Sequence, residues 1–516
     1  MHATPRHARA FRITPFLLPA LGLPLGGIGP AAGDVAAQDP LTGFDAYVAE
    51  AVKAWGVPGL SVAVVKDGAV VFEKGYGVLT LGRPGGVDAH TLFAIGSTTK
   101  AMTAASIGML VDEGKLAWDD PVIDHLPWFR LHDPWLTREV TVRDLLTHRA
   151  GLGNVDFLWY EQDADTREVL EKLRLVEPAY SLRGGFVYQN LMYAAAGAVV
   201  EAVSGIPWAR FVETRIFAPL GMSRSVTTLA AAERMENVAS PHEEVDGELA
   251  VIANASVDPV AAAGSVWSSA HDMARWLAFL LRGCETEAGE ALLEPRTCGE
   301  LFQPQAIVRT SPYPTARLTN PHWITYGLGW FQQDYEGRKL DFHTGSIDGM
   351  VAIAGLVRDE GVGVYVLANR DHAELRHALM LRVVDLYDAD PPRDWSAELH
   401  SLYGEMAARA DSQRAAAAAR RVEGTRPTLP PERYAGTYIH PLRGTLRVEA
   451  TGEGGLRVTY GRLTGPLEHW NYDTFRARWD AAWRGTQLVT FRLDARGAVE
   501  ALEASGAEFR RVEQEG

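Results

Sequence analysis

The stretch Phe93–Lys100, which reads FAIGSTTK, decides the interpretation of this sequence because it places a serine and a lysine three residues apart before an apolar helical segment. Residues i and i+3 share a helix face, so the Ser97 hydroxyl and the Lys100 amine can meet. Residues 101–111 are apolar or small on every face, which predicts a buried helix. Burial favours a neutral lysine, and a serine beside a neutral amine can become a nucleophile.

A Ser-x-x-Lys pattern is short enough to occur by chance, so two further stretches matter. The first is Tyr188-Gln189-Asn190, which precedes a helical run over residues 191–203. In an extended segment Tyr188 and Asn190 project to one side. There a phenol can transfer a proton and an amide can bind a substrate. The alternative is a core tyrosine followed by an asparagine that caps the helix.

The second stretch is His343-Thr344-Gly345, in a strand-like segment that enters a glycine-bearing loop. His343 and Gly345 would share one face, and the glycine would let a substrate backbone lie close to the strand. The alternative is an exposed histidine at a sheet edge.

His148 lies near the end of a capped helix predicted over residues 141–151, and we interpret it as a C-terminal cap, not as a catalytic residue.

The composition indicates a globular protein with ample material for a core, since 47% of its 516 residues are apolar and 22% are charged. The net charge is −15 and no basic stripe with interleaved aromatic residues occurs, so nucleic acid is not expected as a partner. The 15 histidines are scattered, without the His-x-x-x-His or Cys-x-x-Cys spacing of metal sites. We therefore predict neither a metal nor a cofactor.

Residues 1–37 are typical of an export signal. Three arginines precede an apolar run over residues 16–28, and Val35–Ala37 offers a small-residue cleavage site. No other segment has the length of uncharged apolar sequence that a membrane span needs. We expect a periplasmic or secreted protein without a stable membrane span after signal removal. In such a compartment Cys284 and Cys298 can form a disulfide, although two buried thiols explain them as well.

The rest of the chain predicts a large unit over residues 40–390 and a small one over residues 431–516. Two β-branched runs flank Asp67-Gly68, which predicts a hairpin whose first strand is central and covered on both faces. Residues 391–430 are rich in proline and alanine and are interpreted as a linker with a helical patch. Beyond them, about eight short alternating runs predict a small antiparallel barrel or sandwich.

Taken together, the Ser97–Lys100, Tyr188–Asn190 and His343–Gly345 motifs, in this order, resemble the serine β-lactamase and penicillin-binding protein superfamily. The similarity is greatest to the class C β-lactamase and D-alanyl-D-alanine carboxypeptidase branch, with its esterases and D-aminopeptidases, and extends over residues 42–388. The tail from residue 431 is similar to a lipocalin-like domain. The resemblance implies an α/β fold, with a β-lactamase-like antiparallel sheet flanked by helices, plus a small all-β C-terminal barrel.

The resemblance also implies roles for individual residues. Ser97 would be the nucleophile that forms an acyl-enzyme, Lys100 would help to activate it, and Tyr188 would be the general base in acylation and the proton donor to the leaving group. Substrate binding would fall to Asn190, His343, Thr344 and Gly345. The backbone N–H groups of Ser97 and Ser346 would form the oxyanion hole.

His343 replaces a lysine found in many members of this superfamily, so the site offers less fixed positive charge to a substrate carboxylate at neutral pH. We therefore expect an exported serine hydrolase that acts on ester or peptide and amide substrates, with β-lactam hydrolysis as the alternative. A non-catalytic penicillin-binding or ligand-binding protein is the alternative from another class. Hydrolysis or acyl transfer, the oligomeric state and the part played by the tail stay open.

Overall fold

The computed structural model describes residues 39–388, 391–452 and 454–512, so the export signal predicted over residues 1–37 lies outside the described residues. The large unit is built on an eight-stranded sheet in the order β2-β1-β12-β11-β10-β9-β8-β7. All its ladders are antiparallel. The strands are β1 Gly59–Lys66, β2 Ala69–Gly77, β7 Ala306–Ile307, β8 Ile324–Tyr326, β9 Phe331–Tyr335, β10 Arg338–Ile347, β11 Met350–Val357 and β12 Val362–Ala368.

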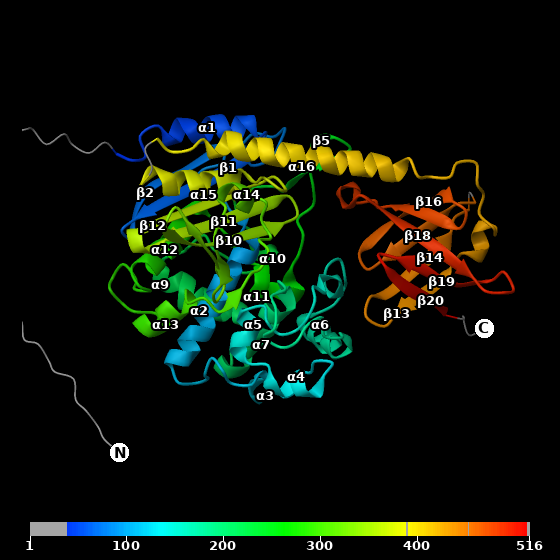
Figure 1. Ribbon diagram of the computed structural model, residues 1–516, viewed down its shortest axis with the longest axis horizontal. Helices are drawn as coiled ribbons and strands as arrows, with labels where there is room; N and C mark the ends of the chain where they lie inside the picture. Colours follow the sequence, from blue (N-terminus) through cyan, green and yellow to red (C-terminus); the bar gives the residue numbers. More distant parts are fainter. Residues whose placement is uncertain (1–38, 389–390, 453, 513–516) are drawn as a thin grey trace, which may run out of the picture.

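Helices cover both faces of this sheet (Figure 1). Successive side chains of a strand point to opposite faces, so Val62 and Val64 pack under α1 Phe44–Ala54 and α15 Leu375–Leu386. Ala63 and Val65 pack into the larger core with α2 Thr99–Asp112, α7 Asn190–Ser204 and α12 Ala270–Leu281. This confirms the prediction that the strand at residues 59–65 is central and covered on both sides.

Shorter elements complete the large unit. They are α3 Val122–His125, α4 Pro134–Glu139, α5 Val142–Leu146, α6 Thr166–Glu171, α8 Trp208–Val212, α9 Ala218–Leu220, α10 Leu229–Ala232, α11 Ala261–Gly264, α13 Pro295–Leu301 and α14 Ala316–Thr319, with the strand pairs β3 Phe93–Ala94 and β6 Trp267–Ser268, and β4 His242–Val245 and β5 Glu248–Val251. Cys284 and Cys298 form a disulfide with a Cα–Cα distance of 5.9 Å, which links the end of α12 to α13.

The helix predicted over residues 141–151 is shorter than expected. Its start is as the sequence indicates, with a capping box between Thr141 and Asp144, but α5 ends at Leu146. Two residues further on, His148 adopts a left-handed backbone conformation with φ +58°. Its Nδ1 accepts a hydrogen bond from the backbone N–H of Gln189 at 2.9 Å. The chain therefore leaves the helix early, and the interpretation of His148 as a helix cap is wrong.

The segment interpreted as a linker contains one long helix, α16 Trp395–Ala418, and not merely a helical patch at residues 415–419. Trp395 and Leu399 are buried in the core beneath α1 and α15, so the first turns of α16 belong to the large unit. Most of the remaining helix is exposed and extends towards the C-terminal unit (Figure 1).

The C-terminal unit is a closed antiparallel barrel, which confirms the prediction of a small all-β barrel. Inward-facing Tyr438, Val458 and Phe491 belong to its apolar core, in the alternation that the sequence showed. The strands are β13 Gly436–His440, β14 Gly444–Ala450, β15 Leu456–Tyr460, β16 Leu463–Asn471, β17 Thr474–Arg478, β18 Thr486–Leu493, β19 Val499–Ala504 and β20 Ala507–Val512.

Within the described ranges, no single helix has the length and apolar character needed to cross a membrane. In the same part of the chain, the helices Asn190–Ser204 and Trp208–Leu220 meet the length and composition criteria as a pair, but the pair is bent by 75°.

Candidate active site

Ser97 lies in a short 3-10 turn, Gly96–Thr98, directly before α2. Lys100 is in the first turn of α2, and its Nζ donates to the Ser97 Oγ at 2.9 Å. Ser97 is half-buried, whereas Lys100 is fully buried. The structure therefore brings the serine hydroxyl and the lysine amine into contact, as the i, i+3 spacing predicts. The contact lies at the N-terminus of α2, whose residues from Thr99 to Leu110 are all buried.

Lys100 is held by neutral groups. Its Nζ also donates to the Asn190 Oδ1 at 2.8 Å and to the Ala263 carbonyl oxygen at 2.9 Å, and it lies 4.8 Å from the centre of the Tyr188 ring. Burial lowers the pKa of Lys100 from 10.5 to about 7, against an opposing effect of the Asp156 carboxylate. A large fraction of Lys100 is therefore neutral at pH 7. The neutral amine keeps two hydrogens for the Asn190 and Ala263 oxygens and can accept the Ser97 proton with its lone pair.

Tyr188 reaches the same place from the segment before α7. Its hydroxyl is buried and has no hydrogen-bond partner among the described residues. Burial raises the pKa of Tyr188 well above 10, and the neighbouring Ser97 hydroxyl opposes this only in part. At neutral pH the phenol therefore keeps its proton and can donate it.

Asn190 is the first residue of α7, and its side chain does not cap the helix. Its Oδ1 accepts from Lys100, while its Nδ2 donates to the Asp156 carboxylate at 3.0 Å. Asp156 is held in turn by the indole N–H of Trp159 at 2.8 Å. An Asp156–Asn190–Lys100 chain thus connects a carboxylate to the amine, and sequence reasoning did not identify Asp156.

His343, Thr344 and Gly345 lie in β10, with His343 only 1% exposed, so the exposed-edge alternative does not apply. The His343 ring is bound on both sides, by the Tyr326 hydroxyl at 3.1 Å and by the Thr344 carbonyl oxygen at 2.6 Å. Burial, together with the charge of Lys100, lowers the pKa of His343 to about 3. The imidazole is therefore neutral over the physiological range, and β10 presents no cation at this position.

The strand β10 runs directly against the Ser97 turn. A Cβ on Gly345 would lie 1.8 Å from the Ile95 carbonyl oxygen and 3.1 Å from the Ser97 nitrogen, and a Cβ on Gly96 would lie 2.6 Å from the Ser346 nitrogen. Only glycines permit this approach. It brings the backbone of Gly345 and Ser346 directly against the Ser97 turn, and the role of the Ser97 and Ser346 N–H groups in an oxyanion hole stays a prediction.

His148 is a member of the site that the sequence did not reveal. It is fully buried, and its ring lies 4.4 Å from the Tyr188 ring and 4.7 Å from the Tyr326 ring, measured between centroids. Burial and the charges of Lys100 and His343 lower the pKa of His148 well below 6.5. The ring is therefore neutral, and because Nδ1 accepts from Gln189, its proton is on Nε2, which has no partner among the described residues.

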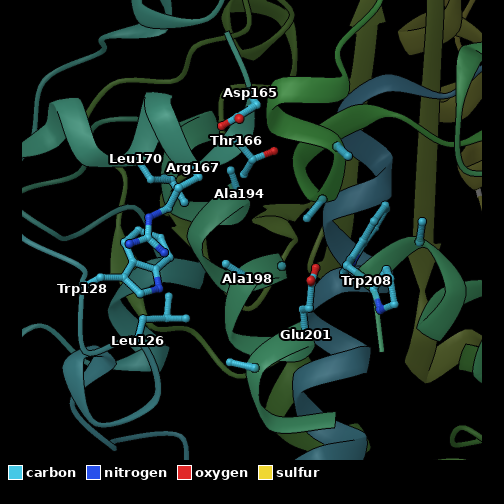
Figure 2. A pocket seen from close by; sticks show the side chains of 16 residues that line it. Leu126, Trp128, Asp165, Thr166, Arg167, Leu170, Ala194, Ala198, Glu201 and Trp208 are labelled. Carbon is cyan, nitrogen blue, oxygen red and sulfur yellow. The ribbon is translucent and has the colours of Figure 1, made fainter. Parts of the chain in front are cut away.

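A separate apolar cavity of about 560 Å³ lies between α6, α7, α8 and α11 (Figure 2). Its lining includes Trp128, Glu201 and Trp208. The Arg167 guanidinium lies over the Trp128 ring, 3.7 Å from the ring centre. None of Ser97, Lys100 and Tyr188 lines it. This cavity is therefore not the place where the predicted nucleophile meets a substrate.

An antiparallel sheet between helices, with a serine and a buried lysine one helical turn apart against a glycine-bearing strand, defines the class of β-lactamase-fold proteins. The family model described as Beta-lactamase matches residues 44–389, and the chain therefore belongs to this family. A second model, described as a domain of unknown function (DUF3471), matches residues 420–515.

Known proteins similar to this chain include hydrolases. The unguisins hydrolase ungD of Aspergillus violaceofuscus is 29% identical over 457 residues, which cover 81% of this chain and 79% of that protein. Among solved structures, the octameric penicillin-binding protein homologue from Pyrococcus abyssi has a TM-score of 0.59 at 22% identity, over 91% of this chain and 99% of that one. A D-stereospecific amidohydrolase from Streptomyces sp. has a TM-score of 0.52 at 23% identity, over 67% and 98%.

Proposed function

We propose that this protein is a serine hydrolase that cleaves ester or amide bonds through an acyl-enzyme on Ser97. The observation that carries the proposal is the hydrogen bond of 2.9 Å between the Lys100 Nζ and the Ser97 Oγ, formed by an amine whose pKa is lowered to about 7 by burial. A weakly basic amine in contact with a hydroxyl is the arrangement that activates a serine at neutral pH.

In acylation, the Ser97 hydroxyl gives its proton to neutral Lys100 while Oγ forms a bond to the substrate carbonyl carbon. The developing oxyanion accepts hydrogen bonds from the Ser97 and Ser346 backbone N–H groups. As the bond to the leaving group breaks, Tyr188 protonates the departing oxygen or nitrogen, and the proton on Lys100 replaces the one that Tyr188 lost. In deacylation, water attacks the acyl carbon, Lys100 takes the water proton, and that proton returns to the Ser97 Oγ.

This assignment divides the roles that the sequence analysis gave jointly to Tyr188. A phenol whose pKa is raised well above 10 by burial is a poor base at neutral pH but a competent proton donor. Lys100 has the opposite balance, because burial lowers its pKa to about 7. We therefore assign the base to Lys100 and the acid to Tyr188.

For the substrate class we propose esters and the amide bonds of peptides that contain D-residues, ahead of β-lactams. The neutral His343 supports this order, since it offers no fixed charge to a β-lactam carboxylate. The names of the relatives, an unguisins hydrolase and a D-stereospecific amidohydrolase, also favour amide hydrolysis. The disulfide between Cys284 and Cys298 supports the proposal that the protein is exported into an oxidising compartment.

The test uses a fluorophosphonate probe and a substrate panel with purified protein. Wild type should be labelled and Ser97→Ala should not. Ser106→Ala is a matched control, because Ser106 lies buried in the same helix and donates only to the Met102 carbonyl oxygen. The panel comprises p-nitrophenyl esters, D-amino-acid p-nitroanilides and a chromogenic cephalosporin. Wild-type protein that neither labels nor turns over any of them would indicate a non-catalytic binding protein, and faster cephalosporin cleavage would indicate a β-lactamase.

A further inference from the structure

Two segments of the large unit adjoin groups of the candidate active site, and the C-terminal barrel contacts both of them. The first segment, residues 154–162, carries Asp156, whose carboxylate accepts from the Asn190 side chain that in turn accepts from Lys100. The second segment is the β10–β11 turn, residues 347–350, which follows Ser346 directly. The first segment thus carries Asp156, which orients Asn190 beside the proposed base Lys100. The second adjoins Ser346, whose N–H is the proposed oxyanion donor.

Arg484 of the barrel joins these two segments. Its guanidinium donates to the Tyr160 hydroxyl and the Glu161 carboxylate of the first segment, and to the Asp348 carboxylate of the second at 2.5 Å. The Tyr160 hydroxyl also donates to Asp348 at 2.8 Å. The side chains of Arg484, Glu161 and Asp348 are only 13–15% exposed, so little solvent screens these ion pairs.

Backbone packing adds to this contact. The Arg462 backbone N–H donates to the Glu161 carbonyl oxygen at 2.8 Å, and the Arg443 guanidinium lies 4.2 Å from the centre of the Phe157 ring. A Cβ on Gly461 would lie 2.0 Å from the same Glu161 oxygen, so the barrel approaches the first segment too closely for any larger residue. The segment that delivers Asp156 is therefore shaped by the barrel.

We infer that Arg484 is a positioning residue, and that the C-terminal barrel completes the active site by fixing Asp156 against Asn190 and the β10–β11 turn against the Ser97 turn. The inference rests on the proposed function. The Asp156 carboxylate accepts a hydrogen bond from the Asn190 Nδ2, so the Asn190 Oδ1 faces Lys100. Loss of the Arg484 contacts frees both segments, so the amide can rotate and the Ser346 N–H can leave the oxyanion position.

The test compares two interdomain arginines in the full-length protein. Arg484→Met removes the contact to both segments. Arg478→Met is the matched control, because Arg478 also pairs with a carboxylate of the large unit, Asp246 at 3.8 Å, but outside these segments. We expect Arg484→Met to lower kcat at least tenfold with little change in KM, Arg478→Met to retain wild-type values, and Arg484→Lys to recover part of kcat.

A second pair of variants tests the contact without removing a charge. Gly461→Ala places a methyl group against the Glu161 oxygen, whereas Gly506→Ala adds one at a similar positive φ in another barrel turn with nothing within 4 Å. We expect Gly461→Ala to lower kcat and Gly506→Ala not to. This pair keeps the inference testable if Arg484→Met does not fold.

The pH profile separates positioning from general loosening. The charged or titratable groups around Lys100 are Asp156, His148, His343, Tyr188 and Tyr193, and of these only Asp156 raises the lysine pKa. Asp156→Asn and Arg484→Met should therefore both move the acid limb of kcat/KM to lower pH. Their combination should cost less than the sum of the two single effects, because both changes act on the Asp156 contact, while Arg484→Met also frees the β10–β11 turn.

Three results would overturn the inference. The first is equal activity of Arg484→Met and Arg478→Met, and the second is an increase in KM alone, which would mean that Arg484 contacts the substrate. The third is fully additive effects of Asp156→Asn and Arg484→Met. All three are measured on turnover that is lost in Ser97→Ala. Wild-type turnover that survives Ser97→Ala would instead refute the proposed function, so the two failures are distinguishable.

Discussion

Acidification should abolish activity with a midpoint near pH 7, because burial lowers the pKa of Lys100 to about 7 and only the neutral amine can accept the Ser97 proton. The sign follows from the charge state: as the pH falls below 7, Lys100 gains a proton and the base is lost. About 10% of Lys100 is neutral at pH 6 and about 1% at pH 5, so kcat/KM should fall about tenfold per pH unit.

The measurement is kcat/KM for a p-nitrophenyl ester between pH 4 and 9 at constant ionic strength, since this parameter reports the free enzyme. Burial lowers the pKa of His343 to about 3 and that of His148 well below 6.5, so neither ring should account for a midpoint near pH 7. His343→Asn is therefore the control and should leave the midpoint unchanged. A profile that stays flat down to pH 5, or a midpoint that moves with His343→Asn, would refute Lys100 as the base.

Three further outcomes follow from the packing around the site. Gly345→Ala should lower kcat about 10²-fold or more, as the loss of an oxyanion donor does. The reason is that its Cβ would lie 1.8 Å from the Ile95 carbonyl oxygen and would push β10 away from the Ser97 turn. The control Gly404→Ala, at a position with open space around it, should retain kcat. Tyr188→Phe should lower kcat by about 10²–10⁴-fold. The melting temperature should stay the same or rise, because the removed hydroxyl is buried without a partner among the described residues. A lower melting temperature would contradict this. Replacing both Cys284 and Cys298 by Ala should lower the free energy of unfolding by about 3 kcal/mol, because the bridge closes a loop between positions 14 residues apart. The kcat at 25 °C should not change. A urea titration with an unchanged midpoint would show that the bridge contributes nothing to stability.

The parts of the fold that the sequence predicted are those set by local patterns. The apolar run before Asp67-Gly68 predicted a central strand, and the run after Lys100 predicted a buried helix, because side-chain periodicity and burial are visible in a few consecutive residues. The end of α5 at Leu146 was not predictable in this way. Just past that end, the ring of His148 accepts a hydrogen bond from the backbone N–H of Gln189, 41 residues further along the chain, and no local pattern indicates this contact.

The same distinction applies to the site. Ser97 and Lys100 could be identified together because i and i+3 spacing is a local geometric fact, and the two other motifs followed from their order and from the family resemblance. Asp156 offers no such signal. It contacts the side chain of Asn190, 34 residues away, and Glu161 of the same segment pairs with Arg484 in another folded unit. Contacts of this kind arise only when distant segments pack together.

A physical feature of this site is that some of its buried polar groups have no hydrogen-bond partner among the described residues. The Tyr188 hydroxyl and the His148 Nε2 are both buried without partners among the described residues, on rings whose centroids lie 4.4 Å apart, although an unsatisfied buried group costs about 1–3 kcal/mol. The large core around α2 and α7 can offset such a cost. Under the proposed function, a substrate that supplies a partner to the Tyr188 hydroxyl would recover part of that free energy on binding, so a group that weakens the folded state would contribute to substrate binding.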